Sequence, residues 1–142
     1  MWVYYSGILL VVLSNVVYHL SQKNTPSNMN PMVSLLVTYL TAAVFTVILL
    51  PFFPLKEGFA SSLKQMNWAS IALGLAVVGL ELGFLLAYRA GWNISIAQFY
   101  ATVLLTLILI PIGVLFFQEK LSLVNILGIA LCLGGFVMLN HK

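Results

Sequence analysis

The sequence predicts an all-α membrane protein with five transmembrane helices. Of the 142 residues, 62% are hydrophobic and only 6% are charged. Soluble domains contain about 25% charged residues, so this composition excludes an ordinary soluble fold. Five apolar stretches each approach the ~20 residues that a helix needs to cross a bilayer. They are residues 2–20, 31–53, 68–88, 94–117 and 121–139.

The segments between these stretches are short, so we expect residues 1–142 to form a single membrane domain. Residues 54–67 are the longest connection and are polar, as in a surface loop. The first stretch follows no basic region and precedes no small-residue cleavage site, so we expect it to remain as a membrane helix. The expected location is the inner (plasma) membrane, as a multi-pass protein surrounded by the lipid bilayer.

The polar residues exclude several other classes of function. A net charge of +3 without a basic cluster does not indicate a nucleic-acid partner. The sequence has no phosphate-binding glycine loop, no metal-ligand cluster and no nucleophile with a base at a recognisable spacing. We therefore expect neither an enzyme nor a cofactor or metal site.

The first predicted helix has one polar face. Asn15, Tyr18 and Gln22 return to this face at helical spacing, and Asn15 and Tyr18 are candidate site residues. His19 lies beside them and has two interpretations. Its unperturbed pKa of ~6.5 suits a proton carrier, but a histidine near a helix end also serves as an interfacial hydrogen-bonding group.

The second predicted helix carries three small hydroxyl residues at helical spacing. Ser34, Thr38 and Thr41 recur at i, i+4 and i+7. This face would line a cavity in one interpretation. In the other, each hydroxyl donates to a carbonyl of its own helix.

The third predicted helix contains an isolated carboxylate, Glu81, inside an apolar run. A charge at the centre of a membrane helix costs at least ~2.5–3.5 kcal/mol, so Glu81 needs a polar environment, a partner or a proton. Tyr88 falls on the same flank as Glu81, whereas Gly79 and Gly83 belong to an opposite flank of small residues that suits close helix packing. We favour a functional role for Glu81, and a structural tie to a neighbouring helix is the alternative.

The fourth predicted helix carries a polar stripe through an apolar segment. Ser95, Gln98, Thr102 and Thr106 lie at i, i+3, i+7 and i+11, and we favour a cavity wall over simple helix–helix hydrogen bonding. Pro111 removes one backbone hydrogen bond from this helix. The last helix is rich in small residues, which suits a dimer contact.

Several of these features together resemble the EamA-type half of the drug/metabolite transporter superfamily, in its short, five-helix bacterial or archaeal branch. The carriers of the likeness are residues 86–91, Ser95, Pro111, the turn at 117–122 and the small-residue helix at 128–135. Typical members have ten helices in two halves of opposite orientation, so the resemblance implies one half-transporter repeat. Related four-helix multidrug transporters keep their key glutamate in the first helix. That helix has no glutamate here, so that site does not carry over.

The main functional hypothesis is a secondary transporter of a small organic metabolite or cation that works by alternating access. Proton coupling through Glu81 is one version of this hypothesis. The expected substrate- or proton-binding residues are Glu81, Gln98, Thr102, Tyr88, Tyr18, Asn15 and Ser95. A non-transporting subunit of a heteromeric complex and a small dual-topology ion channel are the alternatives.

The distribution of loop charges predicts an antiparallel homodimer. With five helices, Lys56, Lys64 and Lys120 lie on one side of the membrane, and Lys23, Arg89 and Lys142 lie on the other. An imbalance of Lys and Arg sets the orientation of a membrane protein. This chain has none, so we expect it to insert both ways and to pair with an inverted copy. The alternative is a parallel dimer whose orientation is fixed by features outside this count, such as the free amino terminus or the position of Arg89 near a helix end.

Overall fold

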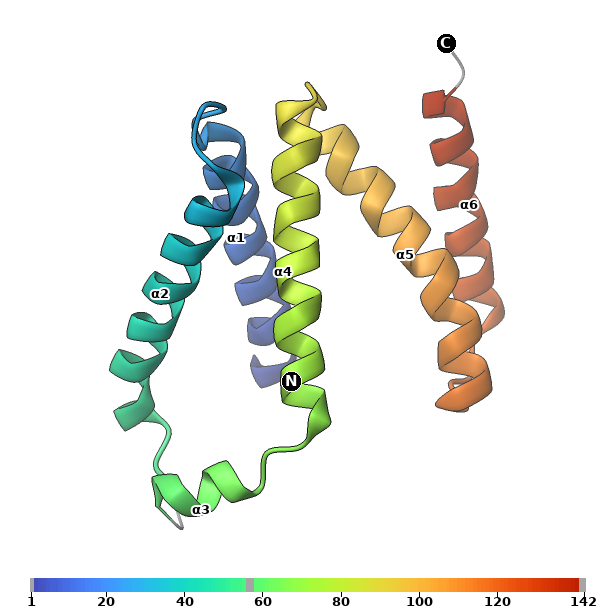
Figure 1. The fold of residues 1–142 in the computed structure, drawn as a ribbon. Helices are drawn as coiled ribbons and strands as arrows, with labels where there is room; N and C mark the ends of the chain where they lie inside the picture. The colour runs from blue at the N-terminus through green and yellow to red at the C-terminus, as the bar shows by residue number, and fades with distance from the viewer. Residues whose placement is uncertain (1, 56–57, 141–142) are drawn as a thin grey trace. The chain divides into compact units, whose positions relative to one another are not determined.

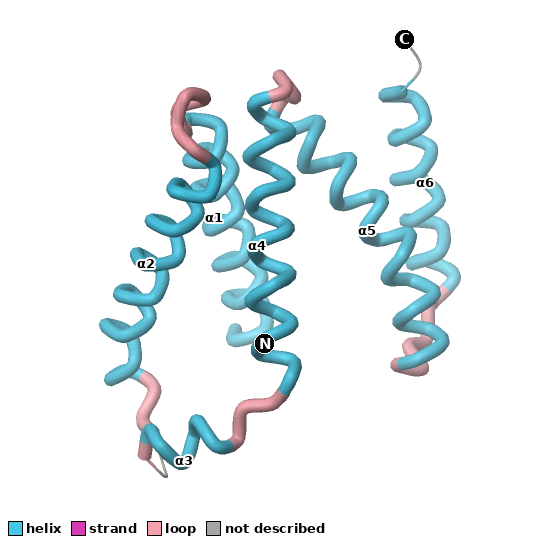
Figure 2. Tube along the Cα trace, viewed as in Figure 1, coloured by secondary structure: helices cyan, strands magenta, loops and turns pink. Residues whose placement is uncertain are grey.

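The computed structural model describes residues 2–55 and 58–140, and in this part of the chain it contains helices and loops but no strand (Figure 2). The helices are named in chain order in Figure 1. Their bounds are α1 Trp2–Asn24, α2 Pro31–Leu49, the 3-10 helix η1 Leu50–Phe52, α3 Phe59–Lys64, α4 Trp68–Arg89, α5 Ile94–Phe116 and α6 Leu123–Asn140.

Asparagine side chains begin two of the long helices. The side-chain oxygen of Asn30 accepts a hydrogen bond from the Met32 amide at 2.8 Å, and Pro31 occupies the first position of α2. The side-chain oxygen of Asn67 accepts one from the Ala69 amide at 2.9 Å at the start of α4. Both contacts satisfy amides that have no partner within the helix.

The connection between α2 and α4 differs from the loop that the sequence predicts. It contains the short helix α3, which follows Gly58 at a φ of +81°. Glycine adopts this left-handed conformation without steric cost, so the chain turns sharply into α3. The segment is therefore partly helical rather than irregular throughout.

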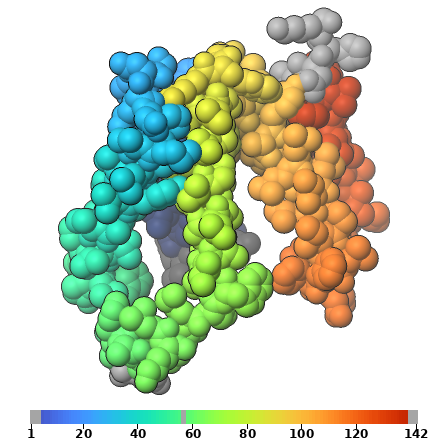
Figure 3. Space-filling model, viewed as in Figure 1, coloured from blue at the N-terminus to red at the C-terminus, as the bar shows by residue number. Residues whose placement is uncertain are grey.

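The chain divides into two compact units, Met1–Gly91 and Trp92–Lys142. In unit 1, α4 is the central helix and contacts both α1 and α2 (Figure 1). The C-terminal ends of α1 and α4 and the N-terminal end of α2 lie near the α1–α2 turn (Figure 1). In the space-filling view, α2 and α4 separate toward α3, and α1 is visible between them (Figure 3).

Unit 2 is a hairpin of α5 and α6, which contact each other. Its turn is fixed by the carbonyl oxygen of Gly113, which accepts hydrogen bonds from the amides of Phe117 and Glu119, both at 3.1 Å. Gln118 takes a left-handed conformation with a φ of +53°. The Ser122 hydroxyl then accepts the Asn125 amide at 3.2 Å near the start of α6.

Apolar side chains point outward along both units, and few described residues are buried. Leucine, isoleucine, valine and phenylalanine make up most of the large hydrophobic side chains that are exposed, as expected for helices that face lipid. Among the described residues, three helical segments are long and apolar enough to cross a membrane, and α6 has a shorter apolar segment at Leu123–Met138. The three are Pro31–Phe52, Trp68–Arg89 and Ile94–Phe116.

Candidate functional site

The buried face of α4 carries Glu81, Leu85 and Tyr88. These residues lie at i, i+4 and i+7, so their side chains point to the same side of the helix. Glu81 is 8% exposed and Tyr88 is 5% exposed. Glu81 lies eight residues before Arg89, a distance of about 12 Å along the helix axis. The structure thus places a carboxyl group inside unit 1, well away from the end of α4.

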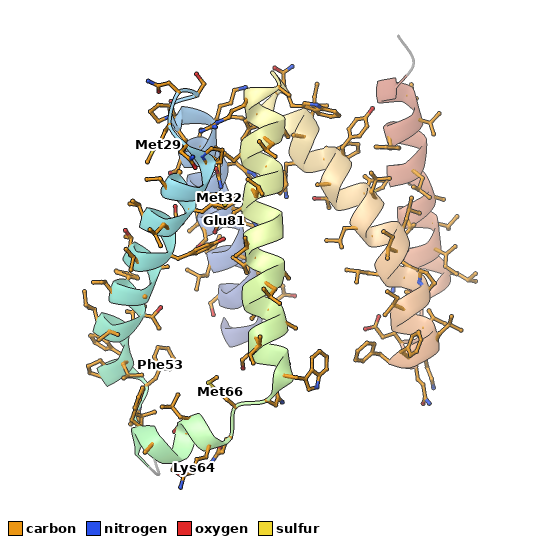
Figure 4. All side chains as sticks on the ribbon, viewed as in Figure 1. Met29, Met32, Phe53, Lys64, Met66 and Glu81 are labelled. Carbon is orange, nitrogen blue, oxygen red and sulfur yellow. The ribbon has the colours of Figure 1, made fainter. Side chains whose placement is uncertain are left out.

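Glu81 lies on the side of α4 that faces α1 and α2, as Figure 4 shows. Gln22 of α1 donates hydrogen bonds to the Glu81 carbonyl oxygen and to the Tyr18 hydroxyl, both at 3.4 Å. Gln22 thus connects the Tyr18 hydroxyl of α1 with the backbone of α4 at Glu81, and α2 packs against the same helix.

The carboxyl oxygen Oε2 of Glu81 is buried and has no hydrogen-bond partner within the described part of the chain. The hydroxyl of Tyr39 on α2 is in the same state. A buried polar atom without a partner costs about 1–3 kcal/mol, and more when it carries a charge. A hydrogen-bond donor that reached Glu81 Oε2 would therefore be stabilising.

An aromatic cluster connects this carboxyl group with the end of the unit. The ring of His19 packs edge-on against Phe84 at 4.7 Å and against Tyr18 at 4.9 Å between centroids. Phe84 in turn packs against Tyr88 at 5.9 Å. The Tyr88 hydroxyl and the Nδ1 atom of His19 form a 2.7 Å hydrogen bond. His19, which the sequence places at an ambiguous position, is buried and hydrogen-bonded here.

Two cations lie at the end of unit 1 next to this cluster. The ammonium group of Lys23 lies 5.6 Å from the ring centroid of Tyr88, within the range of a cation–π interaction. The Nη2 atom of Arg89 donates to the carbonyl oxygens of Pro26 at 3.1 Å and Met29 at 2.7 Å. Arg89 therefore ties the α1–α2 turn to the end of α4, which fixes the relative positions of the helices around Glu81.

The polar stripe of α5 lies in unit 2. Gln98 donates to the Thr102 hydroxyl at 3.3 Å, and the Thr106 hydroxyl donates to the Thr102 carbonyl at 2.7 Å. Thr102 and Thr106 line a cavity of about 510 Å³ between α5 and α6, which Asn125 also lines. Most of the other lining residues are apolar.

Four other polar residues have different surroundings. Asn15 is exposed and lines a shallow groove along α1 together with Tyr18. Ser95 is exposed near the start of α5. On α2, the hydroxyls of Thr38 and Thr41 donate to the carbonyls of Ser34 and Val37 at 3.1 and 2.9 Å. The hydroxyls of these two threonines therefore bond to carbonyls of their own helix, which is the second interpretation of this face.

Sequence reasoning did not select Tyr39 or Phe84 as site residues. Phe84 had a signal, because it lies three residues after Glu81 and four before Tyr88 and so shares their face of the helix. Tyr39 had none. The nearby hydroxyl residues of α2 indicated a polar face of their own, and only the structure shows that the Tyr39 hydroxyl is buried without a partner among the described residues.

Apolar helices with a polar interior define the class of this protein, which is a multi-pass integral membrane protein. Residues 2–141 match the family described as EamA-like transporters. The chain belongs to this family, which is part of the drug/metabolite transporter superfamily, and its members are transporters. No curated protein and no solved structure gave a match.

Proposed function

We propose that the protein is a secondary transporter of a small organic solute and that Glu81 binds the solute or a coupling proton. The observation that carries this proposal is the buried Oε2 atom of Glu81, which has no hydrogen-bond partner in the described residues. A carboxyl group within a membrane helix is costly. A ligand or proton that binds it recovers part of that cost, so the group favours a bound state over an empty one.

Polar side chains provide a route from the end of unit 1 to Glu81. Lys23 and Gln22 lie near the end of α1, and Tyr88 lies near the end of α4. Gln22 donates to both the Tyr18 hydroxyl and the Glu81 carbonyl oxygen. A solute that enters here exchanges its water contacts for hydroxyl, amide and aromatic contacts in steps. This arrangement supports a binding site with access from one surface.

Within unit 2, the cavity between α5 and α6 independently supports binding of a small solute. Thr102 lines it, and Gln98 is hydrogen-bonded to Thr102. Its volume of about 510 Å³ falls within the ~300–1,000 Å³ of small-molecule sites. In this proposal Gln98, Thr102 and Ser95 serve solute binding in unit 2, and Tyr18, Tyr88 and Asn15 serve it together with Glu81 in unit 1.

The working unit in this proposal is an antiparallel homodimer of five-span chains in the inner (plasma) membrane. Alternating access in many transporter folds requires two repeats of inverted topology. One chain supplies one repeat, and a second copy inserted in the opposite orientation supplies the other. The equal numbers of basic loop residues on the two sides support such dual insertion.

Counterflow in proteoliposomes tests the function. Vesicles preloaded with unlabelled solute should accumulate labelled solute, and flux should saturate. Glu81→Gln should abolish this accumulation, whereas Glu119→Gln, which removes a carboxyl group from unit 2, should not. Large electrogenic flux without counterflow would instead identify an ion channel. Silence of the pure protein, with activity restored only by a second chain, would identify a heteromeric subunit.

A further inference from the structure

We propose that the cavity between α5 and α6 binds a small neutral amphiphile, a solute with an aromatic or alkyl body and one hydroxyl or amide group. This inference rests on the proposed transport function and names the class of solute that unit 2 accepts. It assigns the polar contact to Thr106 of α5 and to Asn125 of α6, which lies outside the polar stripe of α5.

The first argument is that the cavity wall carries no charge. Its described lining residues come from α5, α6 and the turn between them, and none of them is charged. The two charged residues of that part of the chain, Glu119 and Lys120, belong to the turn and do not line the cavity. An ion that entered would lose water without gaining a counter-charge, which is unfavourable. The cavity therefore favours a neutral solute.

The second argument is the set of hydrogen-bonding groups that line the cavity. The Thr102 hydroxyl is engaged, because it accepts from Gln98 at 3.3 Å. The half-buried Thr106 uses its hydroxyl proton in the 2.7 Å bond to the Thr102 carbonyl, so its oxygen remains an acceptor. The side-chain amide of Asn125 makes no hydrogen bond with the other described residues and offers both donors and an acceptor. A hydroxyl or amide group, which both donates and accepts, is complementary to these two side chains.

The third argument is the position of the apolar lining. Phe99 lies near the start of α5, seven residues before Thr106 and so about 10 Å from it along the helix axis. Its ring packs against Phe136 of α6 at 6.2 Å between centroids. Because α5 and α6 form an antiparallel hairpin (Figure 1), Asn125 lies close to the turn and away from Phe99. A solute with its apolar body beside Phe99 and its polar group toward Asn125 therefore matches the walls of the cavity.

Two other occupants of this cavity are a lipid chain and a helix from a second copy of the protein. An acyl chain has neither donors nor acceptors, so it would leave the Asn125 amide and the Thr106 oxygen without partners, which is unfavourable. A helix of a second copy, once seated in the cavity, would exclude a solute. These alternatives predict, respectively, no preference for a hydroxyl group and no binding of any solute.

Isothermal titration calorimetry on the full chain in detergent micelles tests the proposal without requiring transport. The probes share one body: 3-phenyl-1-propanol, propylbenzene, 3-phenylpropylamine and 3-phenylpropionate. Thr102→Trp, whose indole would fill part of the cavity, supplies the heat of partition into the micelle. We expect the alcohol to bind the unmodified protein, propylbenzene to bind about fivefold more weakly and the two ions at least about tenfold more weakly. Equal binding of alcohol and propylbenzene, tighter binding of either ion, or no binding would overturn the proposal.

A variant with a matched control assigns the preference for the alcohol to specific atoms. Asn125→Leu should weaken binding of the alcohol about fivefold and leave binding of propylbenzene unchanged. Asn28→Leu makes the same chemical change at an exposed position of the α1–α2 turn and should alter neither. Circular dichroism checks that each variant is folded. If Asn125→Leu does not fold, Thr106→Val, which removes the acceptor oxygen and keeps the volume, decides alone. An unchanged preference for the alcohol in the folded variant would refute the polar contact.

The outcome separates this inference from the proposed function. Binding of the alcohol with the expected selectivity but no flux of any solute would support the solute class and contradict transport. Saturable counterflow of an amine or an acid by a protein that does not bind the alcohol would support transport and refute the neutral-amphiphile site.

Discussion

The two units of the molecule have opposite interiors. In unit 1, three of the five buried described residues are His19, Glu81 and Tyr88, and the other two are leucines. In unit 2 the buried described residues are Ala97, Val103 and Gly113. Both units expose apolar side chains. Lipid tails are as apolar as leucine side chains, so exposed apolar surface does not distinguish the two units. The units differ in their interior residues.

The difference teaches that unit 1 is organised by polar contacts between helices, whereas the side-chain hydrogen bonds described in unit 2 stay within one helix or turn. In unit 1, Arg89, Gln22 and the His19–Tyr88 pair join elements far apart in sequence. In unit 2, the described hydrogen bonds are local, and a cavity remains between α5 and α6. Specific chemistry is therefore expected in unit 1, and space for a solute in unit 2.

The largest expected effect comes from Glu81→Gln, which removes the buried carboxyl charge of unit 1 and keeps the shape of the side chain. We expect flux to fall by about 100-fold, because the lost charge-assisted hydrogen bond contributes up to ~3 kcal/mol. Thermal stability should hold or rise, since a buried charge no longer needs compensation. Proteoliposome flux and thermal unfolding measure the two effects. Unchanged flux at every pH would reduce Glu81 to a structural residue and remove the functional contrast between the units.

Thr102→Trp tests whether unit 2 supplies space. The indole would fill part of the cavity that Thr102 lines, and we expect about a tenfold loss of flux. Thr102→Val is the matched control, because it removes the hydroxyl and keeps the volume, and it should change flux by less than about twofold. Normal transport by Thr102→Trp, or an equal loss in both variants, would contradict a steric role for this cavity.

If the working unit is an antiparallel dimer, the chain should insert into the membrane in both orientations. Reporter tags at the carboxyl terminus should be found on both faces of the membrane in comparable amounts. Two lysines added to one side of the chain should skew this ratio and reduce activity, because Lys and Arg set orientation. Two added glutamines are the control and should leave the ratio unchanged. A tag on a single face of the unmodified protein would refute dual insertion.

Tyr88→Phe measures how far unit 1 depends on its polar interior for stability. It removes the hydroxyl that is hydrogen-bonded to His19. We expect a loss of about 1 kcal/mol in the free energy of unfolding, as for other hydrogen bonds between membrane helices. Unfolding in mixed micelles, followed by circular dichroism, measures it. Tyr100→Phe in unit 2 is the control. An equal loss of unfolding free energy in that variant would contradict the greater dependence of unit 1 on polar contacts.

The smallest effect is expected for Gly113→Ala in the turn of unit 2. A Cβ atom at Gly113 would lie 2.5 Å from Glu119 Oε2. The exposed Glu119 side chain is free to rotate away, so the cost should stay below about 0.5 kcal/mol. In a Glu119→Ala background the same substitution should be neutral. A cost above that of Tyr88→Phe would show that unit 2 is the more tightly constrained half.

The sequence by itself determined the membrane class, because composition and the length of apolar runs depend on no tertiary contact. Helical periodicity also places Glu81 and Tyr88 on one face, since that geometry is local. The position of Thr102 and Thr106 on a common stripe of α5 follows from the same rule. Asn30 and Asn67 begin their helices through contacts only two residues away.

Only the tertiary structure decided which groups meet. Three hydrogen bonds join residues more than 40 positions apart: from Gln22 to the Glu81 carbonyl, between His19 and Tyr88, and from Arg89 to the α1–α2 turn. Helical periodicity fixes the direction of a side chain from its own axis, but not which neighbouring helix it faces. That choice depends on the packing of α1 and α2 against α4, which no local pattern encodes.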